Sequence, residues 1–486
     1  DRERGIFKGD MGFVRSARDV ANIIIRTDDG RDVVINGNDT PTLRLGYALS
    51  DIQTQGVSVD TSRAVVTQQW RGYAAYVAAS RHTAPKGVTF YATKRGDGMM
   101  LSEQLAIEEH EGTALDRLKQ AEDLTRFRNE YPRIETTPFK QELREFAALA
   151  RDELLNRQGT FSRAELKRTV SNAVYSAEWD AAARPHSAVL DDLAREIEKQ
   201  PGMLMTDAGR LTNHDQLKTE HEIMTMAQAM NQNSRHQIVL TPEEERWLRA
   251  GLNPEQYAVI RGLARDGAIS FVEGPAGTGK GKVISVGQKM YRNSGYDVRG
   301  LAPTSAVAGD MSENGIDART IHSAFKQQER GHRKGAWTAN TVLFIDEASM
   351  IGAREMKRLM AHVKASGAKA IFMFDRKQLD PVGSPAGMAG YMADTFGVHR
   401  LTAIQRQKAG WMRDASKDLG QGNVERAIDA YGEHRAIKFA KDAGAAETKL
   451  VERYMQLTKP DVKLEPVKRA EQQEQAMRDI TTMSFR

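Results

Sequence analysis

The chain has 486 residues, of which 70 are Lys or Arg and 65 are Asp or Glu, giving a formal net charge of +5 at neutral pH. This length exceeds a single small module and predicts two to four domains with cores of their own. Its apolar residues form no run near the roughly 18 residues that a membrane span needs, and the absence of cysteine excludes disulfides and thiolate metal sites.

The first hundred residues are expected to form short strands. The segments NIIIRTD and DGRDVVING predict a hairpin around Asp29-Gly30, a pair that favours tight turns. The stretches SRAVVTQ (62–68) and VTFYATK (88–94) also have the composition of strands.

Residues 102–240 are expected to form a mainly helical accessory region. Their charged residues alternate with apolar ones at helical spacing, and Ser162 with Glu165 has the spacing of a capping box at a helix start. No residue type in this region indicates a chemical role.

The stretch GPAGTGK (274–280) has the composition of a phosphate-binding loop. A β-rich apolar run, residues 267–274, precedes it, and residues 282–290 continue at helical spacing. Glycines let the backbone N–H groups turn toward phosphate oxygens, and Lys280 is placed to reach the β- and γ-phosphates. The expected nucleotide-binding residues are Gln256, Gly274, Gly277, Thr278, Gly279, Lys280 and Gly281.

Two adjacent acids follow a second expected strand, in TVLFIDEASM (341–350). At the carboxyl end of a parallel strand, Asp346 would hold Mg²⁺ through water, and Glu347 would orient and deprotonate the attacking water. An Asp-Glu pair after a strand is also a common helix cap, but the phosphate loop upstream favours the catalytic interpretation.

Three further segments add candidate residues. In LNPEQYAVI (252–260), Asn253 and Pro254 predict a helix start that leaves Gln256 to recognise adenine. The segment AKAIFMFD (368–375) predicts a strand, and Gln378 after it is placed to contact the γ-phosphate. The segment 296–311 predicts a strand followed by a helix, where Thr304 and Ser305 either cap the helix or bind a nucleic-acid backbone.

Six motifs in order, LNPEQ, GPAGTGK, LAPTSA, FIDEASM, DRKQLDP and LTAIQRQ (401–407), resemble the first motor lobe of superfamily 1 helicases. The likeness is closest to the RecD-like helicase portion of conjugative relaxase-helicases. It implies an α/β fold with two RecA-like P-loop NTPase lobes plus a helical region, and it implies that Arg406 is an arginine finger.

Signatures of the second lobe lie ahead of the phosphate loop. The segment 46–60, GYALSDIQTQGVSVD, resembles the family's motif V, and AYVAASRH (75–82) resembles motif VI with Arg81 as a second finger. The resemblance therefore divides the chain into 1–101 (second lobe), 102–240 (helical region), 241–440 (first lobe) and 441–486 (opening of a second lobe). Circular permutation, a fragment of two tandem modules, or pieces joined out of biological order would each explain this arrangement.

Three positions depart from the family pattern. Gly281 stands where a Ser or Thr hydroxyl would bind Mg²⁺, Phe374 stands where glycine precedes the motif III aspartate, and Asp51-Ile52 replace a His-Lys type pair. Nucleotide binding is therefore expected more firmly than fast turnover.

The resemblance implies an ATP-dependent translocase on single-stranded DNA, with ATP and Mg²⁺ as cofactors and with conjugation or other DNA-processing proteins as further partners. The expected catalytic residues are Lys280, Glu347, Gln378, Arg406 and Arg81. The expected DNA contacts are Thr304, Ser305, Thr320, His322, Thr54 and Gln55.

Two alternatives remain open. A vestigial module would bind single-stranded DNA with little ATP turnover, and a small-molecule kinase would use the phosphate loop but leave QRQ, TQG and ASR without a role. The composition and the start of the chain, which lacks a secretory pattern, lead us to expect a cytoplasmic location.

Overall fold

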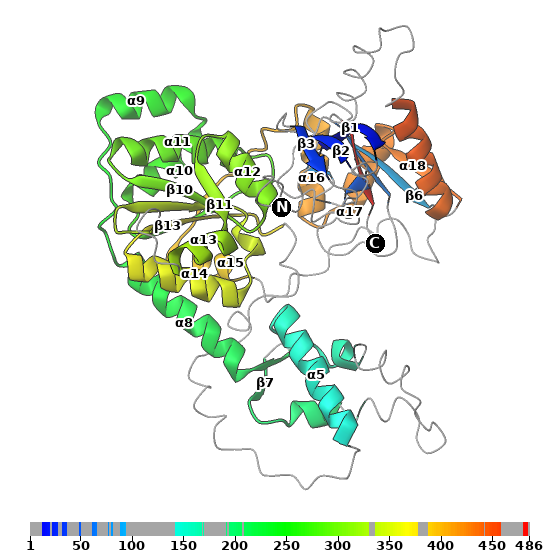
Figure 1. Cartoon of the computed structure of the whole chain (residues 1–486), viewed down its shortest axis with the longest axis horizontal. Coiled ribbons are helices and arrows are strands. Elements are labelled where there is room, and N and C mark those ends of the chain that lie inside the picture. The colour runs from blue at the N-terminus through cyan, green and yellow to red at the C-terminus, as the bar shows by residue number, and fades with distance from the viewer. Residues whose placement is uncertain are drawn as a thin grey trace.

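Three groups of elements make up the fold (Figure 1). A computed structural model describes residues 12–19, 22–27, 32–35, 48–49, 61–65, 76, 79–80, 88–93, 141–167, 169, 191, 194–206, 209–329, 336–377, 387–441, 443–457 and 480–484. Two of the groups contain parallel sheets with helices packed against them, so the expected α/β fold class is confirmed.

The largest group surrounds a six-stranded sheet of the described residues with the order β11-β10-β12-β13-β9-β14. All its neighbouring strands are parallel. The strands predicted at 267–274, 341–345 and 368–375 are thereby confirmed. The strands are β9 (Ile269–Glu273), β10 (Asp297–Ala302), β11 (Asp317–Thr320), β12 (Thr341–Ile345), β13 (Lys369–Phe374) and β14 (His399–Arg400).

Helices cover both faces of this sheet (Figure 1). Leu343 and Ile345 of β12 belong to the core formed with α8, α13, α14 and α15, whereas Val342 and Phe344 belong to the core formed with α9 to α12. Because side chains alternate along a strand, successive residues of β12 pack into the two cores in turn. The helices are α8 (His214–Asn231), α9 (Pro242–Gly251), α10 (Pro254–Arg265), α11 (Lys280–Asn293), α12 (Ser305–Glu313), α13 (Ile321–Glu329), α14 (Ala353–Ser366) and α15 (Met388–Phe396).

A second parallel sheet, of order β15-β6-β5-β16-β4, draws its strands from both ends of the chain. Phe90 on β6 packs edge-on against Tyr431, with ring centroids 5.2 Å apart, and Tyr91 packs with Ala446 and Leu450 on the other face. The elements are β4 (Ala48–Leu49), β5 (Thr61–Val65), β6 (Val88–Thr93), β15 (Ile437–Ala440), β16 (Ile480–Ser484), α16 (Gly410–Gly420), α17 (Val424–Glu433) and α18 (Ala443–Leu457).

Strands β1 (Gly12–Asp19), β2 (Asn22–Thr27) and β3 (Asp32–Ile35) form a separate antiparallel sheet. The pairing of Ile25 with Val33 confirms the expected hairpin.

The third group contains α5 (Gln141–Gln158) and the two-stranded sheet of β7 (Met203–Met205) and β8 (Leu211–Asn213). The expected capping box is confirmed, because the Glu165 amide donates to Ser162 Oγ at 3.2 Å and the Ser162 amide donates to Glu165 Oε2 at 2.6 Å. Helix α8 follows β8 directly and packs against α14, so it joins this group to the largest one (Figure 1).

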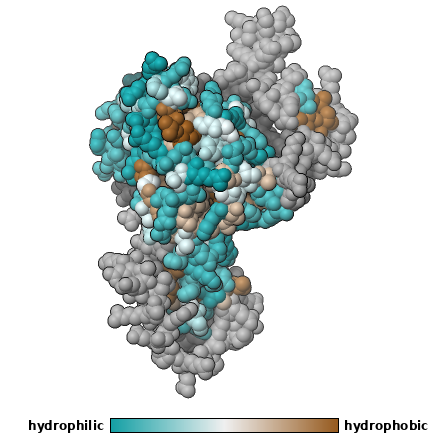
Figure 2. Space-filling view, turned by 90° about the vertical axis from the view of Figure 1, so that its left-hand side faces the viewer, coloured by the Kyte–Doolittle hydropathy of each residue, from teal (hydrophilic) through white to brown (hydrophobic). Residues whose placement is uncertain are grey.

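The face of the molecule in Figure 2 is largely hydrophilic, with a hydrophobic patch on the upper part of the large group. In the part of the chain that the structure describes, no helix has the length and apolar character to cross a membrane.

A buried lysine fixes the turn between α10 and β9. Lys369 is completely buried, and its Nζ donates to the carbonyl oxygens of Leu263, Asp266 and Gly267 at 3.1, 2.8 and 2.7 Å. Burial lowers the pKa of Lys369 to about 7, because a charged ammonium loses its hydration there.

The free energy of unfolding should therefore rise with pH between about 7 and 10.5, since the unfolded chain keeps the Lys369 proton in this window and the folded chain releases it. Lys369→Met has no such proton and should show a shallower rise. Urea denaturation at several pH values measures both slopes. Equal slopes in the two proteins would contradict the prediction.

Candidate functional site

The predicted phosphate loop connects β9 to α11. Gly277 and Gly279 have φ angles of 84° and 92°, which L side chains rarely adopt. A Cβ atom at Gly279 would lie 2.4 Å from Gln256 Nε2, and one at Gly277 would lie 2.8 Å from Arg406 Cβ. Both glycines are therefore required by conformation, and Gly277 is required by space as well, because Cβ of Arg406 lies close to its backbone.

The loop ends at Lys280, the first residue of α11. Its Nζ is buried and donates to the Gly274 carbonyl at 2.7 Å, so the ammonium lies across the loop. No side chain caps the N-terminus of α11, which leaves the positive end of the helix dipole to a bound anion. This loop fits the phosphates of a nucleotide.

The predicted acids lie where β12 ends. The amide of Asp346 donates to the Leu301 carbonyl of β10 at 2.9 Å, and Asp346 Oδ1 accepts the Glu347 amide at 2.9 Å. Glu347 has a left-handed backbone with φ 50° and ψ 44°, which costs about 1 kcal/mol for a residue with a side chain. Strain of this kind is concentrated at functional sites.

Burial, followed by the neighbouring Glu347 carboxylate, raises the pKa of Asp346 well above its usual range, and Lys280 only partly opposes this. A carboxylate in such a place is stabilised by a cation, so these residues fit Mg²⁺. Within the described ranges, no three His, Asp or Glu side chains converge as a metal site. Asp346 would accordingly share the ion with phosphate oxygens and water.

The position of Gly281 is open. A Cβ atom added there would meet no heavy atom within 4 Å. Thr278 is buried, and its hydroxyl donates to the Pro275 carbonyl at 2.8 Å inside the loop. Thr278 is thus committed to the loop's own structure, while residue 281 has room for a hydroxyl-bearing side chain.

The turn that carries Arg406 is attached to the loop and to α10. The Gly277 carbonyl accepts the amides of Gln405 and Arg406 at 2.7 and 3.0 Å. At the other end of the turn, Glu255 accepts the Thr402 and Ala403 amides at 2.7 and 3.0 Å. Burial alone would raise the pKa of Glu255, but the hydrogen bond from the Thr402 hydroxyl, together with those from the two amides, holds it below its usual range.

Glu255 is a functional candidate that the sequence interpretation missed. It lies in the LNPEQ motif beside Gln256, the residue that the sequence predicted to recognise adenine. Gln256 itself closes a capping box with Asn253 and donates from Nε2 to the Thr278 carbonyl at 3.4 Å, so it links α10 to the phosphate loop.

The candidate DNA-contacting residues of the large group follow two adjacent strands. Thr304 accepts the Val307 amide at 3.3 Å as the cap of α12, and Thr320 accepts the Ser323 amide at 3.2 Å at the start of α13. Ser305 is half-buried and His322 is exposed. Both threonines therefore have a structural role at the carboxyl ends of β10 and β11.

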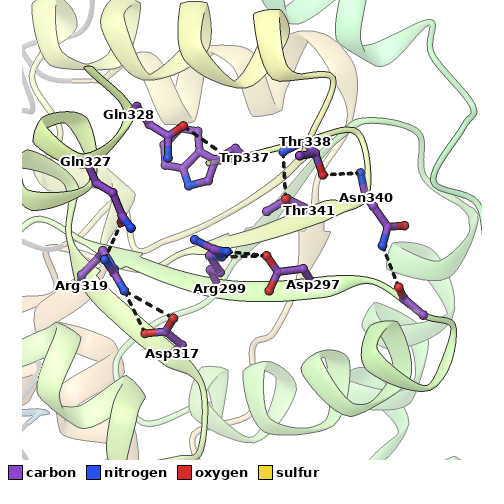
Figure 3. Close-up of polar contacts among 11 residues, drawn as sticks. Asp297, Arg299, Asp317, Arg319, Gln327, Gln328, Trp337, Thr338, Asn340 and Thr341 are labelled. Carbon is purple, nitrogen blue, oxygen red and sulfur yellow. Dashed lines mark hydrogen bonds and ion pairs between the residues drawn. The ribbon is translucent and has the colours of Figure 1, made fainter. Parts of the chain in front are cut away.

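Arginines on the same two strands are paired locally (Figure 3). Arg299 donates to Asp297 at 2.8 Å, and Arg319 lies between Asp317, at 3.3 Å, and Gln327, at 2.5 Å. Their charges are thus paired with nearby acceptors on β10, β11 and α13, so they add less to the attraction of a polyanion than their number suggests.

Part of the predicted motif VI lies against the large group. The carbonyl of Ala79 accepts Gln407 Nε2 at 2.7 Å, and the carbonyl of Ser80 accepts Arg406 Nη1 at 3.2 Å. Four predicted residues lie outside the described residues. They are Arg81, Thr54, Gln55 and Gln378.

Removing the charge of Asp346 should stabilise the protein without its ligands. The raised pKa means that the folded chain holds a proton which the unfolded chain releases, so stability falls as pH rises from about 4 through the folded pKa. Asp346→Asn should thus raise the melting temperature at about pH 8 by a few degrees and have less effect near pH 4. Calorimetry at both pH values checks this, and a lower melting temperature at pH 8 would contradict it.

The family described as an AAA domain matches residues 251–442. The conjugal transfer protein TraA of Rhizobium radiobacter is 35% identical over 37% of this chain and 16% of its own length. The ATP-dependent RecD2 DNA helicase of Deinococcus radiodurans is 29% identical over 42% of this chain and 28% of its own length. The chain therefore matches only a minor part of each relative.

Among solved structures, the Pif1 helicase of Candida albicans aligns over 37% of this chain and 46% of its own, at 22% identity and a TM-score of 0.30. The sequence comparisons, together with the loop and acid pair within the matched range, confirm the expected resemblance of this chain to superfamily 1, RecD-like helicases, including the conjugative proteins among them.

Proposed function

We propose that the chain is an ATP-dependent translocase on single-stranded DNA. Two lobes would close on one ATP, with Lys280, Asp346, Glu347 and Gln378 on the first lobe, Arg81 on the second and Arg406 between them. Each closure and reopening would move the lobes a small step along the strand.

One observation carries this proposal. Arg406 extends from a turn held by the phosphate loop to the carbonyl of Ser80, 3.2 Å away, and Ser80 immediately precedes Arg81 in the chain. Residues that are more than three hundred positions apart thus meet beside the loop. This is the arrangement expected when two half-sites share one triphosphate.

Within such a site, Lys280 and Arg406 would stabilise charge on the phosphates, and Glu347 would orient the attacking water and take its proton. Bound Mg²⁺ would neutralise charge on the β- and γ-phosphate oxygens. Electrostatic stabilisation of this kind supplies most of the rate enhancement in phosphoryl transfer.

The domain division supports the same proposal. Strands β4, β5 and β6 come from residues 1–101, and β16 from residues 441–486 pairs with β4 and β5. We propose that these segments form the second lobe around a common sheet, with 241–440 as the first lobe and 102–240 as the helical region. The end of the 241–440 range departs from this division, because β15 pairs with β6, and α16 and α17 pack against the second sheet.

The proposed DNA strand would cross both lobes, over Thr304, Ser305, Thr320 and His322 on the first and over Thr54 and Gln55 on the second. The net charge of +5 gives weak support. The names of the relatives, a conjugal transfer protein and a DNA helicase, support DNA as the substrate and conjugation as the process, in which other transfer proteins would be partners. We expect this activity in the cytoplasm.

Gly281 favours a second candidate, a module that binds single-stranded DNA with little ATP turnover. Glycine offers no hydroxyl to Mg²⁺, so the ion would be held less firmly and the geometry of the transferring phosphate would loosen.

ATP hydrolysis with and without single-stranded DNA distinguishes the two candidates. The translocase should show hydrolysis that DNA stimulates, Gly281→Thr should increase it by about tenfold or more, and Lys280→Ala should abolish it. DNA binding that ignores ATP, together with no hydrolysis in either wild type or Gly281→Thr, would favour the second candidate.

Arg406→Ala tests the arginine finger. Because the guanidinium stabilises charge that grows in the transition state, hydrolysis should fall by about 10³-fold while nucleotide affinity stays within a few fold. Single-turnover hydrolysis and the fluorescence of a labelled nucleotide measure the two quantities. Arg426→Ala is the control, since Arg426 is 76% exposed on α17. Equal losses in affinity and rate would contradict the assignment.

A further inference from the structure

Tyr76 is a buried tyrosine with two polar contacts that no catalytic role requires. Its side chain is 2% exposed. Its hydroxyl donates to Asp375 Oδ2 at 3.0 Å and accepts the amide of Ala276 at 2.9 Å. The same amide also lies 2.9 Å from Asp375 Oδ2. Tyr76, Asp375 and Ala276 thus form a closed triangle of hydrogen bonds, which we call the loop latch.

The loop latch joins three parts of the proposed motor. Ala276 lies in the phosphate loop, and Asp375 follows β13 and uses its other oxygen to accept the Lys377 amide at 3.0 Å, next to Gln378 in the chain. Tyr76 lies five residues before Arg81. One hydroxyl therefore connects the loop, the segment leading to the γ-phosphate contact and the segment leading to the second arginine.

The same face of the Tyr76 segment makes the other contacts with the large group. Residues 76, 79 and 80 are spaced as neighbours on one face of a helical turn. The backbone carbonyls of Ser80 and Ala79 accept Arg406 and Gln407. Tyr76 uses its side chain to reach the phosphate loop.

The ring of Tyr76 is packed closely enough to remain in place without its hydroxyl. It belongs to the cluster that includes Ala276, Met412 and Leu419. A Cβ atom at Gly420 would lie 3.2 Å from the ring, which shows how near α16 approaches. In Tyr76→Phe, the buried Asp375 would keep the amides of Ala276 and Lys377, so the fold should survive.

We propose that Tyr76 is a positioning residue, whose hydroxyl couples the phosphate loop to the segment that carries Arg81. This inference rests on the proposed function. When phosphates enter the loop, a shift of Ala276 is passed to Asp375 and Tyr76 together. The hydroxyl thereby keeps the second arginine in register with the triphosphate and takes no part in binding the nucleotide.

The test compares Tyr76→Phe with wild type in DNA-stimulated ATP hydrolysis and in binding of a labelled nucleotide. Loss of a hydrogen bond to a buried carboxylate should lower kcat by about tenfold, while the nucleotide Kd stays within about twofold. Tyr431→Phe is the control, because Tyr431 lies in the same cluster but its hydroxyl makes no hydrogen bond to the phosphate loop within the described residues. Unchanged kcat, or equal losses in kcat and affinity, would overturn the proposal.

Hydrogen exchange separates this proposal from the function on which it rests. In the protein without nucleotide, Tyr76→Phe should speed exchange of the peptide containing Ala276, and Tyr431→Phe should not. Faster exchange in a chain that hydrolyses no ATP, even as Gly281→Thr, would support the loop latch and contradict the proposed motor function. Unchanged exchange would remove the loop latch itself, whatever the rate of hydrolysis.

Discussion

The structure of the site depends on hydrogen bonds that the backbone of the phosphate loop makes to the rest of the protein. The Gly277 carbonyl holds the turn of Arg406, and the Ala276 amide meets Asp375 and Tyr76. Lys280 donates to the Gly274 carbonyl across the same loop, whose composition and backbone fit phosphates. A nucleotide bound there, as we propose, would act on the same few residues as the second group of elements, so a small shift of the loop backbone would affect both.

Local signals allowed much of the large group to be predicted from the sequence. The strand before the loop, the helix after it and the capped start of α10 at Asn253 all depend on neighbours within four residues. The alternation of residues in β12 is also a local pattern, but the two cores to which these residues belong are known only from the helices on the two faces of the sheet. Glycines at 277 and 279 marked positive φ angles because other residues rarely adopt them.

The contacts that assemble the site were harder to predict because they join distant parts of the chain. Tyr76 lies 299 positions from Asp375, and Glu255 lies 147 positions from Thr402. Neither pairing has a local signature, since a tyrosine in an apolar stretch usually indicates core packing. The pairing of β16 with β5 likewise joins distant parts of the chain. The motifs suggested it only because those of the second lobe precede the phosphate loop. The burial of Lys369 could not be predicted either, since no pattern in the sequence around it indicates that the ammonium is completely buried.

The contacts around the site explain why the lack of a hydroxyl at residue 281 need not change the geometry of the other site residues. Glu347 keeps a strained backbone and Asp346 a disfavoured charge, so both are held in place by surrounding contacts such as the hydrogen bond from the Asp346 amide to β10. Residue 281 contributes to none of these contacts, and the space around it is open. In the proposed function, glycine at this position would weaken the binding of Mg²⁺, while the lysine, the acids and the arginine turn would keep their geometry. The proposed defect would then be confined to one ligand of the Mg²⁺ ion.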